Sequence, residues 1–176
     1  MNSLRLEKNI IDMMQEEQLK LGYRREAVRL YYPLLSLNRL LETECNVDQM
    51  SEILDTFCSH VEARLGRIQI VRQRERFCLI IPAQGSEYVR EHMADHSFLQ
   101  DFIDTISRHG ATMEEVLQPF YHHSDKVHVE KLTGDEFDYL VYFENGIPDD
   151  YRYCITQEGS HITYHRFTID DYNDLR

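Results

Sequence analysis

The last third of the chain constrains the fold most, because residues 125–167 alternate apolar and polar side chains with a period of two. This alternation is typical of β-strands that have one buried face and one solvated face. The predicted strands cover residues 126–132, 136–144, 151–157 and 160–167. Four consecutive strands with short connections predict an antiparallel meander.

The last turn predicts how the third and fourth strands pair. If Glu158 and Gly159 form the two-residue tip of this hairpin, Arg152 lies directly opposite His165. The two side chains then share one face of the sheet.

The other two pairings follow from the same reasoning. A three-residue turn over residues 133–135 sets Val127 opposite Val141. The middle pairing must keep the apolar faces together, and the register that does so places Glu144 beside Arg152. A slip by one residue would bury the charged side chains.

This register predicts one apolar and one polar face. The apolar face, ready to receive helices, carries Val127, Val129, Phe137, Tyr139, Val141, Phe143, Tyr153, Ile155, Ile162 and Tyr164. The polar face carries His128, Glu130, Asp138, Tyr142, Glu144, Arg152, Cys154, Thr156, His161, Thr163 and His165. Any ligand recognised by the sheet is expected on the polar face.

The rest of the chain has mainly the apolar spacing of helices. Helices are predicted over residues 3–21, 33–42, 48–65, 86–94 and 97–109, and from residue 112 onwards. Asp48 is predicted to cap the third of these. Residues 67–82 predict a β-hairpin, whereas residues 24–32 fit no single element.

We therefore expect an α+β fold in a single domain over residues 1–176, a length typical of one domain. The antiparallel sheet comprises the C-terminal meander, with the middle hairpin at its edge or as a separate ribbon. Five or six helices are expected to cover one face of the sheet.

The net charge of −12 is concentrated towards the end of the chain, where residues 125–176 hold 5 basic and 12 acidic side chains. Such a surface repels phosphate backbones and anionic lipids, so no binding to nucleic acid or to a membrane is expected. It would suit a basic protein partner, a cationic ligand or a divalent metal. The simpler alternative is that the acidic residues only keep the protein soluble.

Recognised motifs of cofactor binding and catalysis are missing from the sequence. It contains no P-loop, no GxGxxG turn after a strand, no GxSxG elbow and no HExxH helix. We therefore expect no cofactor, and whether the protein is an enzyme stays open.

The cysteines and the hydropathy pattern indicate in which cellular compartment the protein is expected. The four cysteines form no CxxC pair, and no apolar run approaches the ~18 residues that a membrane span needs. The first residues follow a charged amphipathic pattern rather than that of a signal peptide. We expect a cytoplasmic protein with reduced thiols.

The predicted polar face contains one candidate binding site. Glu144, Arg152 and His165 form one row across three strands, with Tyr142 and Cys154 in the next row. Neighbouring strands lie ~4.8 Å apart, so the arginine could orient a carboxylate or phosphate while His165 serves as acid or base. The alternative is a cross-strand charge ladder worth about 0.2–1 kcal/mol per pair.

A metal site is not expected on this face. His161 and His165 have a zinc-like spacing, but on a strand they lie ~13 Å apart, too far for one ion. A site that combines His128 with His161 from different strands stays open.

Three segments carry a resemblance to a known family: EEQLKLGYRREAVRLYYPLLSLNRLL, FDYLVYFENGIPDDYRYC and HITYHRFTIDDY. Together they resemble an uncharacterised bacterial domain-of-unknown-function family. The resemblance implies a bacterial origin, and it transfers no catalytic residue because the family has no assigned activity.

Two functions therefore compete. The first is a non-enzymatic acidic protein that binds a basic protein partner through its C-terminal sheet region. The second is a binder of a small anionic metabolite, or a small enzyme, that uses the polar face around Arg152 and His165. The oligomeric state is open, and an N-terminal helix or a second copy of the chain could cover that face.

Overall fold

The computed structural model describes residues 2–95 and 97–176. The chain divides into two compact units, Met1–Ala94 (the N-terminal unit) and Asp95–Arg176 (the C-terminal unit). Each unit combines an antiparallel sheet with helices, so the predicted α+β class is confirmed. The expectation of a single domain over residues 1–176 stays a prediction.

The N-terminal unit is built around a three-stranded antiparallel sheet with the order β1-β3-β2. Its elements are α1 (Ser3–Leu21), β1 (Val28–Pro33), α2 (Leu34–Leu41), α3 (Val47–Leu65), β2 (Gln69–Gln73), β3 (Arg76–Ile81) and α4 (Ala83–Glu91). The predicted middle hairpin is therefore confirmed as β2 and β3, and it belongs to a sheet separate from the C-terminal meander. Its third strand, β1, arises from the segment that the apolar pattern left undecided, and Pro33 is tolerated there because β1 is an edge strand.

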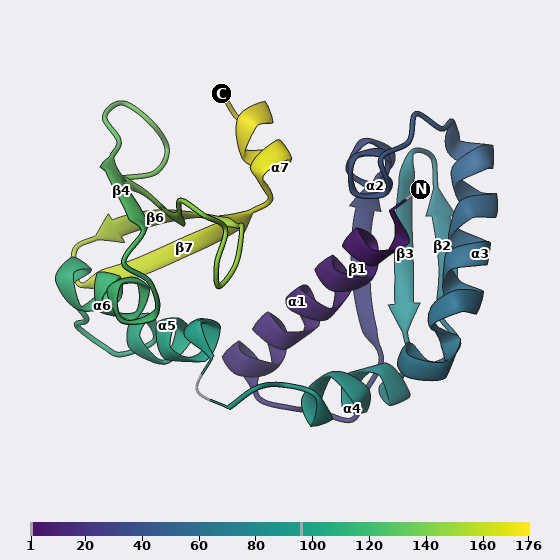
Figure 1. Cartoon of the computed structure of the whole chain (residues 1–176), viewed down its shortest axis with the longest axis horizontal. Coiled ribbons are helices and arrows are strands. Elements are labelled where there is room, and N and C mark those ends of the chain that lie inside the picture. Colours follow the sequence, from purple (N-terminus) through teal and green to yellow (C-terminus); the bar gives the residue numbers. More distant parts are fainter. Residues whose placement is uncertain (1, 96) are drawn as a thin grey trace. The chain divides into compact units, whose positions relative to one another are not determined.

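One apolar core holds the N-terminal unit together. Figure 1 shows α1 and α3 beside the sheet, and their apolar stripes meet the inward side chains of β1 and β3. The fully or almost fully buried members include Leu6, Ile10, Met14, Leu30, Leu54, Phe57, Val61, Phe77 and Leu79. Burial of apolar side chains at about 1.5–3 kcal/mol each is the main stabilising contribution.

The start of α3 differs from the prediction by two residues. Asn46, not Asp48, caps the helix: its side chain accepts hydrogen bonds from the backbone of Asp48 and Gln49. The Gln49 side chain accepts in return from the Asn46 backbone N–H, at 3.0 Å, which closes a capping box. Asp48 lies in the first turn and forms an ion pair with Arg72.

The C-terminal unit contains the predicted four-stranded meander, in the order β4-β5-β6-β7. Its elements are α5 (Phe98–Ile106), α6 (Met113–His123), β4 (Val127–Lys131), β5 (Tyr139–Phe143), β6 (Arg152–Glu158), β7 (His161–Phe167) and α7 (Ile169–Asp174). Helices α5 and α6 lie on one side of the sheet and α7 on the other (Figure 1). The short helix α7 was not predicted.

Aromatic rings fill the interface between the sheet and α5 and α6. Phe102 packs edge-on against Tyr164 and Tyr153, with ring centroids 4.8 and 5.1 Å apart. Phe98 meets Phe143 at 4.8 Å in the same geometry, and Phe120 lies 4.7 Å from Phe98. These edge-to-face contacts add to the apolar burial and orient both helices on the predicted apolar face.

The register of the last hairpin differs from the prediction by two residues. Arg152 pairs with Phe167, and His165 pairs with Cys154. The predicted tip is wrong because Gly159 and Ser160 form the turn, where Gly159 takes a positive φ of 63°. A shift of two residues keeps every side chain on its predicted face but changes its neighbours.

The other two pairings shift in the same way. Val127 pairs with Phe143, and Val141 pairs with both Val129 and Tyr153. As a result β5 ends at Phe143, and Glu144 lies in the following turn rather than beside Arg152.

The connection between β4 and β5 is also longer than predicted. Residues 132–138 form a loop, which the Leu132 backbone N–H closes by donating to the carbonyl of Asp138 at 2.8 Å. Phe137 lies in this loop and packs with the side chains of α7 and the predicted polar face. Its predicted place on the apolar face was wrong because it does not belong to a strand.

Candidate functional site

Three of the predicted site residues lie together on the polar face of the meander. His128 and Tyr142 are cross-strand partners, and their rings stack with centroids 4.6 Å apart. The guanidinium carbon of Arg152 lies 3.8 Å from the centroid of the Tyr142 ring. This His128–Tyr142–Arg152 row joins three neighbouring strands, and the cation–π contact is worth about 0.5–1 kcal/mol where it is exposed.

The predicted row of Glu144, Arg152 and His165 is not formed. Glu144 lies in a turn beyond β5, and His165 pairs with Cys154 instead of Arg152. The exposed His165 ring packs beside Phe137 and Phe167, with centroids 5.5 and 5.9 Å away. The two-residue shift of register separates the three polar groups that were to act together.

The middle of the polar face is apolar and covered. Cys154 is fully buried and packs with Leu132, Leu140 and Tyr172, the last of which comes from α7. Burial raises the pKa of the Cys154 thiol to about 11, so the thiol stays protonated at neutral pH. Cys154 is therefore a core residue, and the central part of this face packs against the C-terminal helix α7 rather than against an N-terminal helix.

The histidines give no joint metal site. His128 lies on β4 and His161 on β7, the two edge strands of the sheet, so three strand spacings of ~4.8 Å separate them. Within residues 2–95 and 97–176, no group of three or more His, Cys, Asp and Glu side chains is placed to hold a metal ion. No helix in the described part of the chain combines the length and the apolar character needed to cross a bilayer.

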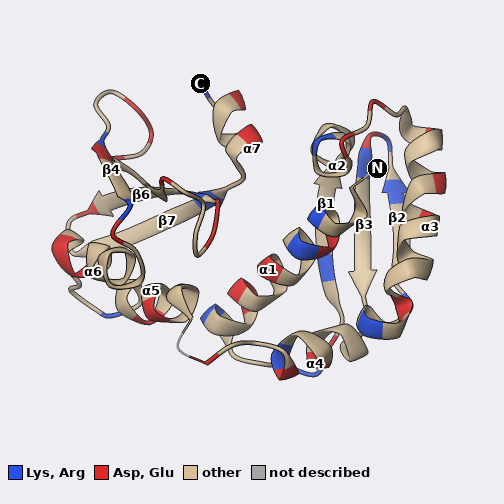
Figure 2. Cartoon of the chain, viewed as in Figure 1, with Lys and Arg blue, Asp and Glu red and all other residues tan. Residues whose placement is uncertain are grey.

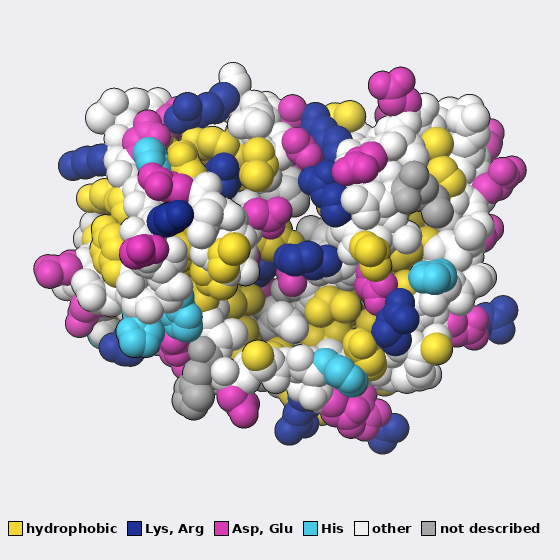
Figure 3. Space-filling view, in the orientation of Figure 1, with side chains coloured by type: hydrophobic (Ala, Val, Ile, Leu, Met, Phe, Trp, Pro, Cys, Tyr) yellow, Lys and Arg dark blue, Asp and Glu magenta, His cyan; other side chains and the backbone are white. Residues whose placement is uncertain are grey.

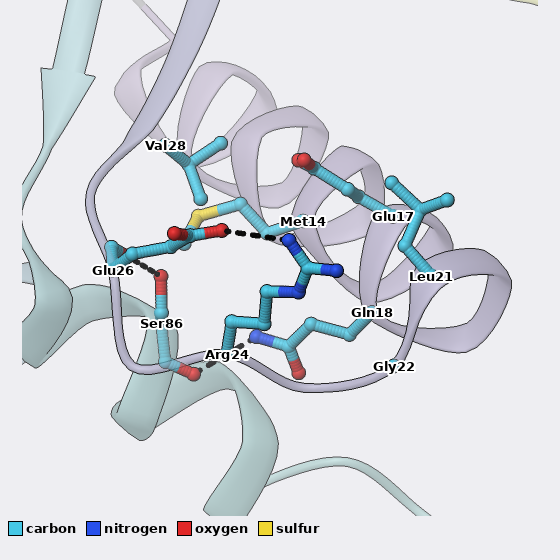
Figure 4. A pocket seen from close by; sticks show the side chains of 9 residues that line it. All are labelled: Met14, Glu17, Gln18, Leu21, Gly22, Arg24, Glu26, Val28 and Ser86. Carbon is cyan, nitrogen blue, oxygen red and sulfur yellow. Dashed lines mark hydrogen bonds and ion pairs between the residues drawn. The ribbon is translucent and has the colours of Figure 1, made fainter.

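A small pocket in the N-terminal unit was missed from the sequence (Figure 4). It has a volume of about 120 Å³ and lies between the C-terminal half of α1, the loop before β1 and the start of α4. Its lining residues are Met14, Glu17, Gln18, Leu21, Gly22, Arg24, Glu26, Val28 and Ser86. All but one lie within residues 14–28, and the pocket forms only because Ser86 of α4, which is distant in sequence, packs against them.

Two hydrogen bonds fix the walls of this pocket. The Gln18 Nε2 donates to the carbonyl oxygen of Ser86 at 2.9 Å, and the buried Ser86 hydroxyl donates to the carbonyl of Glu26, also at 2.9 Å. Helix α4 also packs closely against the end of α3 because residue 85 is Gly: a Cβ there would lie 2.7 Å from the carbonyl oxygen of Leu65. The three segments are thus held in place by polar contacts as well as by the core.

One polar atom in the pocket wall has no partner. Gln18 Oε1 is buried and receives no hydrogen bond from any described residue. Arg24 reaches across the pocket towards Glu26, but their charged atoms are 4.0 Å apart and both side chains are largely exposed (Figure 4). The pocket therefore combines a fixed acceptor with a loosely held cation.

A second, more open hollow lies between α5 and α6 in the C-terminal unit. It has a volume of about 420 Å³ and is lined by Asp101, Asp104, Thr105, Arg108, Glu115, Gln118, Pro119 and His122. At its edge His123 Nε2 lies 2.6 Å from Asp101 Oδ2. Pro119 has no N–H to give to the carbonyl of Glu115, so a backbone acceptor is left without its helical partner.

Comparison with known proteins places the chain in a family. A family model described as "Domain of unknown function, E. rectale Gene description (DUF3877)" matches residues 3–176. The description names a bacterium and gives no activity. No curated protein and no solved structure matches the chain.

Proposed function

We propose that this chain, which belongs to a family without an assigned activity, has in its C-terminal unit an acidic binding module for a basic protein partner. The observation that carries this proposal is the uneven division of charge. The N-terminal unit holds 13 basic and 14 acidic side chains, and the C-terminal unit holds 6 basic and 17 acidic. Almost the whole net charge of −12 therefore belongs to the C-terminal unit.

The acidic residues of the two units have different surroundings. In the N-terminal unit many are paired with bases: Arg64 binds Glu7 through two hydrogen bonds of 2.7 and 3.0 Å, and Arg72 binds Asp48 at 2.7 Å. In the C-terminal unit the acidic side chains outnumber the lysines and arginines by 11. Figure 2 shows blue and red mixed along the N-terminal unit, with red prevailing in the other.

The acidic side chains are dispersed over the surface in the space-filling view rather than gathered in one patch (Figure 3). A dispersed excess of one sign produces an attractive field over the whole unit, which raises the rate of association with an oppositely charged partner. The same field repels nucleic acid and anionic lipid.

The hollow between α5 and α6 offers a place for a basic side chain of the partner. Asp104 is exposed at its edge, and the carbonyl of Glu115 lacks a helical hydrogen bond. A lysine or arginine has donors for both acceptors. The exposed acids of the sheet region, such as Glu130, Glu136 and Glu144, would add longer-range attraction.

We assign this function to the bacterial cytoplasm. Cys45, Cys58, Cys78 and Cys154 are all unbridged, which fits a reducing compartment. The bacterial name in the family description supports the origin.

The test compares two sets of charge reversals in the full chain. The first set changes Glu130, Glu136 and Glu144 of the C-terminal unit to lysine, and the matched control changes Glu52, Asp55 and Glu62 of the N-terminal unit. All six residues are exposed, and both sets alter the net charge equally. Binding of a fluorescent lysine- and arginine-rich peptide is measured at two salt concentrations.

The first set is expected to weaken binding at least tenfold and to reduce its salt dependence, whereas the control has a small effect. Equal losses in both sets would mean that only the total charge matters. No measurable binding by the unaltered protein, together with no basic protein recovered by cross-linking in cells, would refute the proposal.

A further inference from the structure

The pocket of the N-terminal unit, between α1 and α4, is lined by two carboxylates and by one buried amide oxygen that has no donor. The lining residues include the carboxylates of Glu17 and Glu26 and the unpartnered Gln18 Oε1. The guanidinium of Arg24 is the cation among them. A buried acceptor without a donor is unfavourable, so an incoming group that carries N–H donors would be favoured at this place.

The orientation of the Gln18 amide is determined by its neighbour. Its Nε2 donates to the Ser86 carbonyl at 2.9 Å, so turning the amide over would set two oxygens against each other. The acceptor atom therefore keeps its place in the wall, beside the loop that contains Gly22 and Arg24 (Figure 4).

Arg24 occupies the pocket without being held firmly. Its side chain lies between Glu26 and Gln18 in Figure 4, yet it is 72% exposed and its guanidinium is 4.0 Å from the Glu26 carboxylate. An exposed ion pair at this distance contributes little. The arginine is thus a cation that a ligand can displace.

The remaining lining atoms are apolar. Met14 is buried at the back of the pocket, and Leu21 and Val28 lie on either side of the view in Figure 4. These side chains offer contact to a short chain of methylene groups but no further charge. The pocket therefore combines a cation-accepting end with an apolar wall.

From this geometry we infer that the pocket binds a small aliphatic guanidinium or ammonium compound. Its cationic head displaces Arg24, donates to Gln18 Oε1 and faces Glu26, and its methylene groups pack against Met14 and Val28. This site lies in the N-terminal unit and does not depend on the proposed function of the C-terminal unit.

The test uses agmatine, a four-carbon methylene chain with a guanidinium at one end and an ammonium at the other, as the probe in a calorimetric titration of the full chain. Glutarate and 1-butanol serve as the anionic and uncharged control compounds. We expect saturable binding of agmatine alone. Arg24→Ala is expected to tighten this binding about tenfold, because no side chain then competes, whereas Arg25→Ala, which removes an equally exposed arginine next to it, leaves it unchanged.

Two variants of Gln18 test the acceptor itself. Gln18→Leu and Gln18→Glu both lose the donor to Ser86, but only the glutamate keeps an oxygen that can accept from a cation. We expect Gln18→Leu to weaken agmatine binding at least tenfold and Gln18→Glu to preserve or strengthen it. Gln15→Leu, on the same helix but outside the pocket lining, is the matched control.

Several results would overturn the inference. One is no binding of agmatine by either the unaltered protein or Arg24→Ala, and another is equal binding by Gln18→Leu and Gln18→Glu. Preferred binding of glutarate would show that Arg24 recognises anions instead. Tighter binding of a Gly-Arg-Gly peptide than of agmatine would mean that the cation belongs to a partner protein rather than to a small molecule.

Discussion

The two units differ in how far their acidic side chains are balanced by basic ones. The N-terminal unit, with 13 basic and 14 acidic side chains, brings bases to acids, as in the double hydrogen bond between Arg64 and the largely buried Glu7. In the C-terminal unit, with 6 basic and 17 acidic side chains, the acids outnumber the lysines and arginines by 11, so most of them have no such base of their own to pair with. Charges that are paired contribute to the stability of a fold, whereas charges left unpaired in excess weaken it through mutual repulsion.

This difference suggests a division of labour. The excess negative charge of the C-terminal unit lowers its stability but attracts a basic partner. The balanced charge of the N-terminal unit is suited to enclosing a small ligand. The four predictions that follow ask whether the units are separate in their energetics and whether their charges act as this comparison requires.

The largest effect is expected from the aromatic core of the C-terminal unit. Phe102→Ala removes the ring that packs against Tyr153 and Tyr164, which should cost about 3–5 kcal/mol of the free energy of unfolding. Hydrogen exchange should show loss of protection in β6 and β7 with α3 unchanged. Phe57→Ala is the mirror experiment for the N-terminal unit. If either change unfolded both units together, the chain would behave as the single domain expected from its length.

A smaller effect is expected from the paired acid of the N-terminal unit. Glu7→Gln keeps the shape of the side chain but removes the charge that Arg64 binds, so we expect a loss of about 1–2 kcal/mol in the free energy of unfolding. Glu52→Gln, at an exposed position on α3, should change it by less than about 0.5 kcal/mol. Urea denaturation measures both. Equal changes in the free energy of unfolding for the two variants would show that the Glu7–Arg64 ion pair does not stabilise this unit.

In the C-terminal unit, replacing a glutamate by glutamine should increase the free energy of unfolding rather than decrease it. Glu136→Gln and Glu144→Gln remove exposed carboxylates from an excess of acid, and each should raise the free energy of unfolding by a few tenths of a kcal/mol. Added salt should stabilise this unit in the same way and reduce the gain from the substitutions, because it screens the repulsion. A loss of stability in both variants would show that these carboxylates have favourable partners.

The sequence predicted the meander and its faces because alternation of apolar and polar side chains reports which face a residue occupies. It could not distinguish registers that differ by two residues, because such registers bury the same side chains. The choice lay in the turn, where Gly159 and Ser160 form the tip instead of Glu158 and Gly159. That turn places Phe167 rather than His165 opposite Arg152, and the shifts in the other two pairings leave Glu144 beyond β5, so the predicted row does not form.

Other features left weaker signals in the sequence. Helix α7 has only six residues, so its apolar pattern is too short to read, although Thr168 caps it. Strand β1 was undecided because its pairing with β3 depends on residues far along the chain. The pocket around Gln18 depends on a hydrogen bond to Ser86, and the two residues are distant in sequence. Local periodicity carries no information about such contacts.

The smallest expected effect concerns the two capping boxes, one in each unit. Helix α3 is closed by Asn46 and Gln49, which do not titrate, whereas α6 is closed by Thr112 and Glu115. Hydrogen bonds from the Thr112 backbone N–H and hydroxyl lower the pKa of Glu115. A lowered folded-state pKa means that this stabilisation is fully present above the ordinary glutamate value of about 4.3 and is lost as the pH falls through the folded-state value.

Acidification below about pH 4.3 should therefore fray the first turn of α6 but not that of α3. The measurement is the protection of the amides of residues 113–116 and 47–50 against hydrogen exchange, each corrected for its intrinsic rate. Glu115→Gln should make the two helices alike, because a glutamine at this position closes the box at every pH, as Gln49 does. Parallel fraying of both helices would assign the effect to the rising positive charge of the whole protein. Fraying of α6 alone would show that the caps of the two units differ in their response to pH because one contains a titratable glutamate and the other a glutamine.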